Sequence, residues 1–218
     1  MDKIDVFYFI NLERRTDRFQ QIMGEFAKMN IPLNKIIRIQ AAEEKIGILG
    51  CTKSHCFAID HFIKSGKERC MVLEDDFEFT ETKEKVNEIL TNIFVANTPI
   101  DCLLLSGPDN SVMATSHPNL KKIYFAVTTG GYVLFKHFAP SLLNTWVEAG
   151  QKQEKWIKVF GEPENAFNLD YYWIYSQVAS HYYFTNPKLG KQRESVSDVA
   201  GTSKVTMTHI MPNKIENA

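Results

Sequence analysis

Short apolar segments alternate with amphipathic segments over the first hundred residues of the chain. The apolar segments are rich in β-branched and aromatic residues, which is typical of buried strands. The amphipathic segments repeat apolar residues at helical spacing. Strands are expected over 6–10, 36–39, 70–73 and 100–105, and helices over 19–30, 52–66 and 82–94. This alternation predicts βαβ units around a mostly parallel central sheet, which is an α/β fold.

The second half of the chain continues this pattern less regularly. Further strands are expected over 122–127, 131–135 and 182–184, and further helices over 139–149 and 171–178. The segment 109–119 is polar and rich in turn-forming residues, so we expect a mobile loop there. We expect the polar tail from about 190 onward to be ordered only in part, or on ligand binding. No shift in composition divides the chain, which predicts a single domain over residues 1–218.

Composition argues against several classes of protein. The 25 basic and 26 acidic residues give a formal net charge of −1, which argues against binding nucleic acid through a broadly basic surface. The four cysteines form neither a disulfide framework nor a zinc motif, so we expect reduced thiols. The sequence has no signal-peptide pattern and no apolar run long enough to span a bilayer. We therefore expect a cytoplasmic protein without a transmembrane segment, for which peripheral membrane contact stays possible; the sequence does not indicate its oligomeric state.

Three consecutive acids, Glu74, Asp75 and Asp76, follow the third predicted strand. In open α/β sheets, ligands bind outside the carboxyl ends of the strands. Grouped carboxylates repel one another unless a cation or hydrogen bonds compensate, and their oxygens suit Mn²⁺ or Mg²⁺. Such an ion would bridge the acids to a diphosphate and offset charge on a leaving phosphate. The alternative is a solvated turn whose acids cap the next segment.

Two other polar segments also follow the pattern of a binding site. The segment 11–18 comes directly after the first strand, where an Asn can read a base edge and an Arg can pair with phosphate. It could equally be a charged first turn of a helix. In the segment 47–55, two glycines precede a predicted helix. Glycines allow a ligand to approach the backbone closely, and the N-terminus of the helix favours binding of an anion or a ribose hydroxyl. The alternative is an ordinary loop that leads into a helix. Neither a P-loop nor a dinucleotide glycine motif is present.

Taken together, these segments resemble glycosyltransferase family 25, the group of lipooligosaccharide and procollagen galactosyltransferases. The matching elements occur in the family's order along nearly the whole chain. They are Asn11-Leu12-x-Arg14-x-x-Asp17-Arg18, Gly50-Cys51-x-x-Ser54-His55, Val72-Leu73-Glu74-Asp75-Asp76, Gly131-Tyr132-Val133-Leu134, Asp170, and Pro187…Gln192…Ser197-Asp198-Val199. The chain departs from the family at Ile48, where the family has a Glu, and at Asn168-Leu169, which replace a Pro-Val pair.

The resemblance implies a GT-A fold, a Rossmann-like α/β sandwich that binds a nucleotide sugar together with Mn²⁺ or Mg²⁺. It also implies inverting transfer of a hexose, mostly galactose, from a UDP-sugar to a hydroxyl of a glycan or of a hydroxylysine-type peptide. The implied donor-binding residues are Asn11, Arg14, Ser54, Glu74, Asp75, Gln192 and Ser197. The implied metal ligands are Asp76, Glu74 and His209, and Asp170 would contact the donor hexose or act as the catalytic base.

Two other classes of function stay open at this point. The chain could be a nucleotide-sugar-binding module without catalysis, because the loop 47–49 lacks the family's carboxylate. It could also be a nucleotidyltransferase or a metal-dependent phosphohydrolase, since acids at a strand end suit those reactions as well. For the glycosyltransferase, the segments 109–119 and 191 onward are candidate lids, because excluding water suppresses hydrolysis of the donor.

Overall fold

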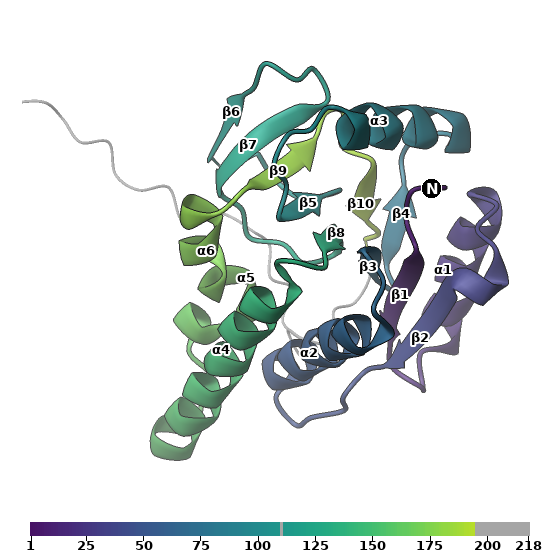
Figure 1. The fold of residues 1–218 in the computed structure, drawn as a ribbon. Coiled ribbons are helices and arrows are strands. Elements are labelled where there is room, and N and C mark those ends of the chain that lie inside the picture. Colours follow the sequence, from purple (N-terminus) through teal and green to yellow (C-terminus); the bar gives the residue numbers. More distant parts are fainter. Residues whose placement is uncertain (110, 195–218) are drawn as a thin grey trace, which may run out of the picture.

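A computed structural model describes residues 1–109 and 111–194. Its centre is an eight-stranded sheet with the order β2-β1-β3-β8-β5-β9-β7-β6. The strands are β1 (Val6–Asn11), β2 (Ile36–Gln40), β3 (Arg69–Glu74), β5 (Cys102–Leu104), β6 (Ser111–Ala114), β7 (Leu120–Phe125), β8 (Gly131–Phe135) and β9 (Tyr182–Thr185). Figure 1 shows the sheet crossing the molecule between the helices.

Six of the eight strands run in the same direction. β1 pairs in parallel with β2 and with β3, and β5 pairs in parallel with β9. β8 runs antiparallel between β3 and β5, and β7 runs antiparallel between β9 and β6. The predicted α/β class and the mostly parallel central sheet are therefore confirmed, with β8 and β7 as the two reversed strands.

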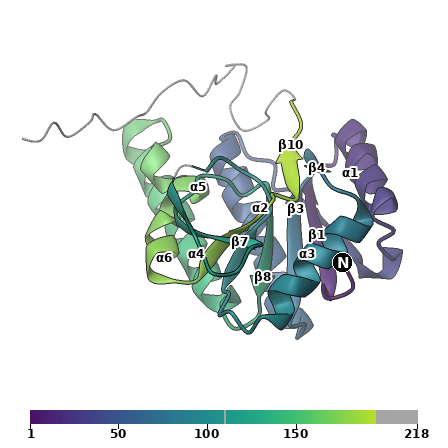
Figure 2. The same cartoon turned by 90° about the horizontal axis from the view of Figure 1, so that it is seen from above.

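Helices cover both faces of the sheet (Figure 2). They are α1 (Thr16–Lys28), α2 (Gly47–Ser65), α3 (Lys83–Val95), α4 (Ala139–Phe160), α5 (Leu169–Tyr172) and α6 (Ile174–Ala179), with short 3-10 turns η1 (Leu33–Lys35) and η2 (Asn165–Phe167). Phe7 and Phe9 of β1 join the core formed with α1 and α3, whereas Tyr8 joins the core formed with α2 and α4. Because successive side chains of a strand point to opposite faces, β1 is buried on both sides, which explains its continuous apolar sequence.

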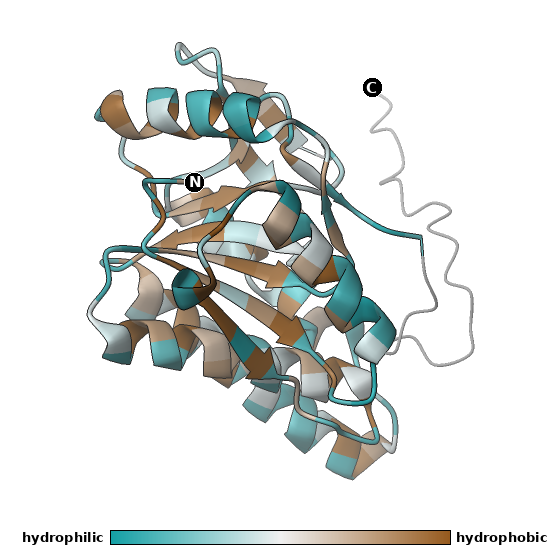
Figure 3. Cartoon of the chain, turned by 90° about the vertical axis from the view of Figure 1, so that its right-hand side faces the viewer, coloured by the Kyte–Doolittle hydropathy of each residue, from teal (hydrophilic) through white to brown (hydrophobic). Residues whose placement is uncertain are grey.

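Side-chain hydropathy follows these layers. Figure 3 shows the strands mostly in the brown of hydrophobic residues, while the helices mix brown with teal. Among the helices that the structure describes, none has the length and apolar character needed to cross a bilayer.

Several predicted helix boundaries are wrong. α2 begins at Gly47 rather than at Thr52, so the glycines 47 and 50 lie in the helix and not in a loop. A Cβ on Gly50 would lie 2.5 Å from the carbonyl oxygen of Ala42, so the chain after β2 approaches α2 only because Gly50 has no side chain. α4 extends to Phe160, and the predicted helix 171–178 is two short helices, α5 and α6.

Two segments expected to be irregular contain strands. In the segment 109–119, where we expected a mobile loop, Ser111–Ala114 form β6, which pairs with β7. In the polar tail, Gly190–Gln192 form β10, which pairs antiparallel with β4 (Phe77–Phe79). A side chain on Gly190 would overlap the buried ring of Phe77, so this pairing depends on the glycine. The start of the tail is thus fixed next to the acidic turn after β3.

Candidate functional site

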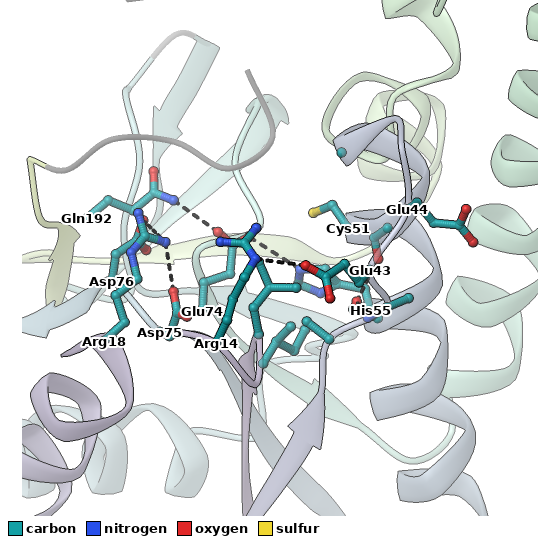
Figure 4. Close-up of a pocket in the computed structure, with 17 residues that line it drawn as sticks. Arg14, Arg18, Glu43, Glu44, Cys51, His55, Glu74, Asp75, Asp76 and Gln192 are labelled. Atoms are coloured by element: carbon teal, nitrogen blue, oxygen red, sulfur yellow. Dashed lines mark hydrogen bonds and ion pairs between the residues drawn. The ribbon is translucent and has the colours of Figure 1, made fainter. Parts of the chain in front are cut away.

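A pocket lies at the edge of the sheet where β1, β2 and β3 end (Figure 4). Its volume is about 170 Å³, and it is open to solvent. Its walls are the chain after β1, the chain after β2, the first turns of α2, the acids at the end of β3, and β10. The charged or titratable lining residues are Arg14, Arg18, Glu43, Glu44, Cys51, His55, Glu74, Asp75 and Asp76. The pocket thus lies where a parallel sheet places its ligands.

Asp75 is held by two side chains from the first quarter of the chain. Asn11 Nδ2 donates a hydrogen bond to Asp75 Oδ2 at 2.7 Å, and Arg18 NH1 donates to Oδ1 at 2.9 Å. Asn11 Oδ1 in turn accepts a hydrogen bond from Arg38 at 2.6 Å. Burial raises the pKa of Asp75, and the bonds from Asn11 and Arg18 oppose that shift. Asn11 and Asp75 are therefore bound to each other; contact between them and a donor stays a prediction.

Burial raises the pKa of Asp75 as it does that of Asp76, but Asp75 is the acid to which both Asn11 and Arg18 donate. Replacing Asp75 with asparagine puts an amide donor beside these two buried donors and removes one charge of a buried ion pair, so we expect it to destabilise the protein by about 3–5 kcal/mol. The side chains of Asp75 and Arg18 are each 9% exposed. Urea unfolding at pH 7.5 measures the change. Asp60→Asn is the matched control, since Asp60 forms an exposed ion pair with Lys64 on α2. Equal effects of the two substitutions would contradict a structural role for Asp75.

Asp76 carries an oxygen without a hydrogen-bond partner among residues 1–109 and 111–194. Its Oδ1 is buried, and none of the residues in the described ranges donates to it. Its Oδ2 lies 3.7 Å from Arg18 NH1. Burial, and next the negative charge of Glu74, raise the pKa of Asp76 to about 7. A buried carboxylate in this state is costly unless a cation compensates its charge.

These observations fit the divalent cation that the sequence motifs imply. Glu74 and Asp76 offer carboxylate oxygens, the ligands that Mn²⁺ and Mg²⁺ prefer, and one Asp76 oxygen is not engaged by the rest of the described chain. His209, the third expected ligand, and Ser197, an expected donor contact, lie outside the described residues.

A second set of potential ligands shares Glu74. The ligand atoms of Cys51, His55 and Glu74 all lie within 4.8 Å of one another. His55 Nδ1 lies 3.1 Å from the Tyr132 hydroxyl, and Nε2 lies 3.3 Å from Glu74 Oε1, so hydrogen bonds engage both ring nitrogens. Burial raises the pKa of the Cys51 thiol well above its usual range, and metals bind the thiolate. Cys51 and His55 would therefore have to lose a proton or a hydrogen bond before they could bind a metal.

Glu74 joins the pocket to Asp170 through hydrogen bonds. The Thr129 hydroxyl lies 3.0 Å from Glu74 Oε1 and 2.9 Å from Asp170 Oδ1. Gln192 of β10 donates to Glu74 Oε2 at 3.3 Å. Burial raises the pKa of Glu74, but the hydrogen bonds from His55 and Thr129 outweigh it and hold the pKa below its ordinary value. The structure therefore brings together Glu74, Gln192 and Asp170, which the sequence places far apart.

Asp170 lies in the first turn of α5, where the Asn168 side chain caps its backbone N–H at 3.3 Å. Burial, and next the charge of Glu74, raise the pKa of Asp170 to about 6. A carboxylate with such a pKa is ionised at neutral pH, yet it accepts a proton more readily than an ordinary aspartate. Asp170 is not one of the residues that line the pocket, and it is joined to the lining residue Glu74 through the Thr129 hydroxyl.

Arg14 and Ser54 both line the pocket. Arg14 lies at its mouth, where Nε is 2.8 Å from Glu43 Oε1, and both side chains are exposed. The Ser54 hydroxyl accepts from the Ala42 N–H at 2.8 Å and donates to the Gly50 carbonyl at 2.6 Å. Ser54 thus fixes the chain after β2 against α2.

Thr129 belongs to the site through its bonds to Glu74 and Asp170, although the sequence did not predict it. Thr129 precedes β8, and β8 runs antiparallel to β3. The start of β8 is therefore at the edge where β3 ends, because Gly131 pairs with Leu73. Nothing in the local sequence signals this reversal; only the strand order reveals it.

No model of a known protein family matches the chain, and no curated protein matches it. Among solved structures, it is similar to the mannose-1-phosphate geranyltransferase of Thermus thermophilus, with 10% identity, 88% of this chain and 74% of that chain covered, and a TM-score of 0.47. It is also similar to a glycosyltransferase involved in the glycosylation of the major capsid of PBCV-1, with 10% identity, coverage of 83% and 92%, and a TM-score of 0.43. At these scores neither likeness bears on the chemistry of this chain. The resemblance to glycosyltransferase family 25 rests on the sequence motifs alone.

Proposed function

We propose that the chain is a metal-dependent glycosyltransferase that uses a nucleotide sugar as donor. The observation that carries this proposal is the buried Asp76 oxygen to which no described residue donates, in a pocket that Arg14 and Arg18 also line. A cation at Glu74 and Asp76, together with the guanidinium groups that line the same pocket, would provide the positive charge that a diphosphate requires. The family motifs support the same function, because four of them contribute residues to the lining of this pocket, among them Arg14, Ser54, Asp76 and Gln192.

The finer assignments rest on the resemblance to family 25. They are a UDP-sugar donor, galactose as the transferred hexose, inversion at the anomeric carbon, and an acceptor hydroxyl on a glycan or a hydroxylysine-type peptide. Arg14, Ser54 and Gln192 line the pocket and are proposed donor contacts. Asn11 and Asp75 are proposed to hold this wall of the donor site in shape through their mutual hydrogen bond.

In the proposed reaction, Asp170 takes the proton of the acceptor hydroxyl. The acceptor O–H bond breaks, and the acceptor oxygen forms a bond to the anomeric carbon of the donor. The bond from that carbon to the diphosphate breaks, and the diphosphate leaves with the electron pair. Attack opposite to the leaving group inverts the configuration. Mn²⁺ or Mg²⁺, when bound by Glu74 and Asp76, would offset the charge that develops on the leaving group.

A thermal-shift screen of nucleotide sugars with Mn²⁺ tests this function, because a ligand that binds only the folded state raises its stability. We expect a UDP-sugar to raise the Tm of the protein in Mn²⁺ but not in EDTA. When an acceptor is added, we expect the protein to release UDP from the same donor. UDP binding without turnover on any donor would instead favour a binding module. Product formation from a nucleoside triphosphate without sugar transfer would favour a nucleotidyltransferase.

A further inference from the structure

Thr129 holds the only hydroxyl within the described ranges that is bonded to both Glu74 and Asp170. It is 2% exposed, in the chain that leads into β8. A threonine hydroxyl has one proton, so Thr129 donates to one of the two carboxylates at a time or shares the proton between them as a bifurcated hydrogen bond. The orientation of the Asp170 carboxyl group is therefore tied to Glu74, the acid next to the proposed cation site.

The two oxygens of Asp170 differ in their surroundings. Oδ1 lies 2.9 Å from the Thr129 hydroxyl. Among residues 1–109 and 111–194, none donates a hydrogen bond to Oδ2. Because Thr129 engages Oδ1, Oδ2 is the oxygen that is left for a substrate hydroxyl.

The backbone around Thr129 is fixed to the end of β3. The Glu74 N–H donates to the Gly130 carbonyl at 2.9 Å. A side chain on Gly131 would overlap the Phe77 ring, and one on Gly130 would lie 2.9 Å from the Gln192 side chain. Two adjacent glycines thus let β3, β4 and β10 close in on this segment. Thr129 therefore has little freedom to follow Asp170 if that side chain turns.

We propose that Thr129 is the positioning residue for the catalytic base. Its hydroxyl holds Asp170 through Oδ1, so that Oδ2 faces the acceptor hydroxyl at a fixed place relative to the acids that bind the leaving diphosphate. The inference rests on the proposed function. It adds that Thr129 aligns the removal of the acceptor proton with the departure of the diphosphate. Alignment of this kind contributes strongly to rate, because small displacements of a catalytic group are costly.

The test compares Thr129→Val, which keeps the side-chain shape but lacks the hydroxyl, with Thr129→Ser, which keeps the hydroxyl. We expect Thr129→Val to lower kcat by about 30- to 100-fold and to leave the donor KM and the affinity for UDP with Mn²⁺ within about threefold. Thr129→Ser is expected to retain kcat within about threefold. Thr145→Val on α4 is the matched control, since Thr145 bonds only to the carbonyl of Ser141 in its own helix.

Wild-type kcat in Thr129→Val would overturn the inference. So would a Thr129→Ser variant as slow as Thr129→Val, or a parallel loss of UDP affinity, which would indicate a merely structural role. A crystal structure of Thr129→Val adds a readout that does not need turnover: Asp170 should turn away from its wild-type orientation, and an unmoved Asp170 would overturn the inference as well. If Asp170 turns but the wild-type protein transfers no sugar, the proposed function fails while the anchoring by Thr129 stands.

Discussion

Replacing Asp76 with asparagine is expected to stabilise the metal-free protein and to abolish sugar transfer. Burial and the charge of Glu74 raise the pKa of Asp76 from its ordinary value of 3.8 to about 7. The folded state therefore holds this proton more tightly than the unfolded chain does, and ionisation costs stability increasingly as pH rises from about 4 to 7. Asparagine carries no charge and avoids this cost.

The gain in unfolding free energy should be on the order of 2 kcal/mol at pH 8 and smaller at pH 5. Urea unfolding of both proteins in EDTA measures it. Mn²⁺ should stabilise the wild type and not Asp76→Asn. Asp75→Asn serves as the contrast, because it is expected to destabilise the protein. If Asp76→Asn destabilises the apo protein as Asp75→Asn does, or if it retains full turnover, Asp76 is not the cation ligand.

Replacing Asp170 with asparagine is expected to lower kcat by about 10²- to 10⁴-fold, the range for loss of a general base. The wild type should lose activity as pH falls through about 6, because burial and the charge of Glu74 raise the pKa of Asp170 to about 6 and only the ionised form accepts a proton. The residual activity of Asp170→Asn should not fall in this way as the pH is lowered through about 6. UDP affinity should not change, because Asp170 is not one of the residues that line the pocket.

The exposed Glu148 of α4 offers a matched control. Glu148→Gln should keep both the wild-type kcat and the loss of activity as pH falls through about 6. If the activity of Asp170→Asn still falls as pH is lowered through about 6, another group takes the proton. Loss of UDP binding in parallel with kcat would show that Asp170 supports the donor site instead.

The regular elements of the first half were predictable because each signals itself locally. β1 and β3 are apolar runs buried on both faces, and α3 begins after Thr82, whose side chain accepts a hydrogen bond from Lys85 as an N-cap. The elements that the sequence did not predict correctly have physical reasons. β4 and β10 are three residues long and carry no periodicity, and glycines that signal a loop serve at α2 to let two segments approach closely.

The three acids of the site were predictable, but not which of them binds neighbouring side chains and which offers an oxygen to a cation. Asp75 is bound by Asn11 and Arg18, which lie 64 and 57 positions earlier in the sequence. Asp76 has an oxygen to which nothing in the described part of the chain donates. The sequence places the three acids side by side and says nothing of which one the neighbouring elements neutralise. Thr129 reaches Glu74 because β8 is reversed in the sheet, which depends on strand order rather than on local pattern.

A crystal structure of the protein with Mn²⁺ and UDP tests the central proposal most directly. We predict anomalous density for manganese within coordination distance of Asp76 Oδ1 and of a diphosphate oxygen, in the pocket where β1, β2 and β3 end. Manganese and UDP bound away from Asp76, or a pocket that stays empty at saturating concentrations of both, would contradict it.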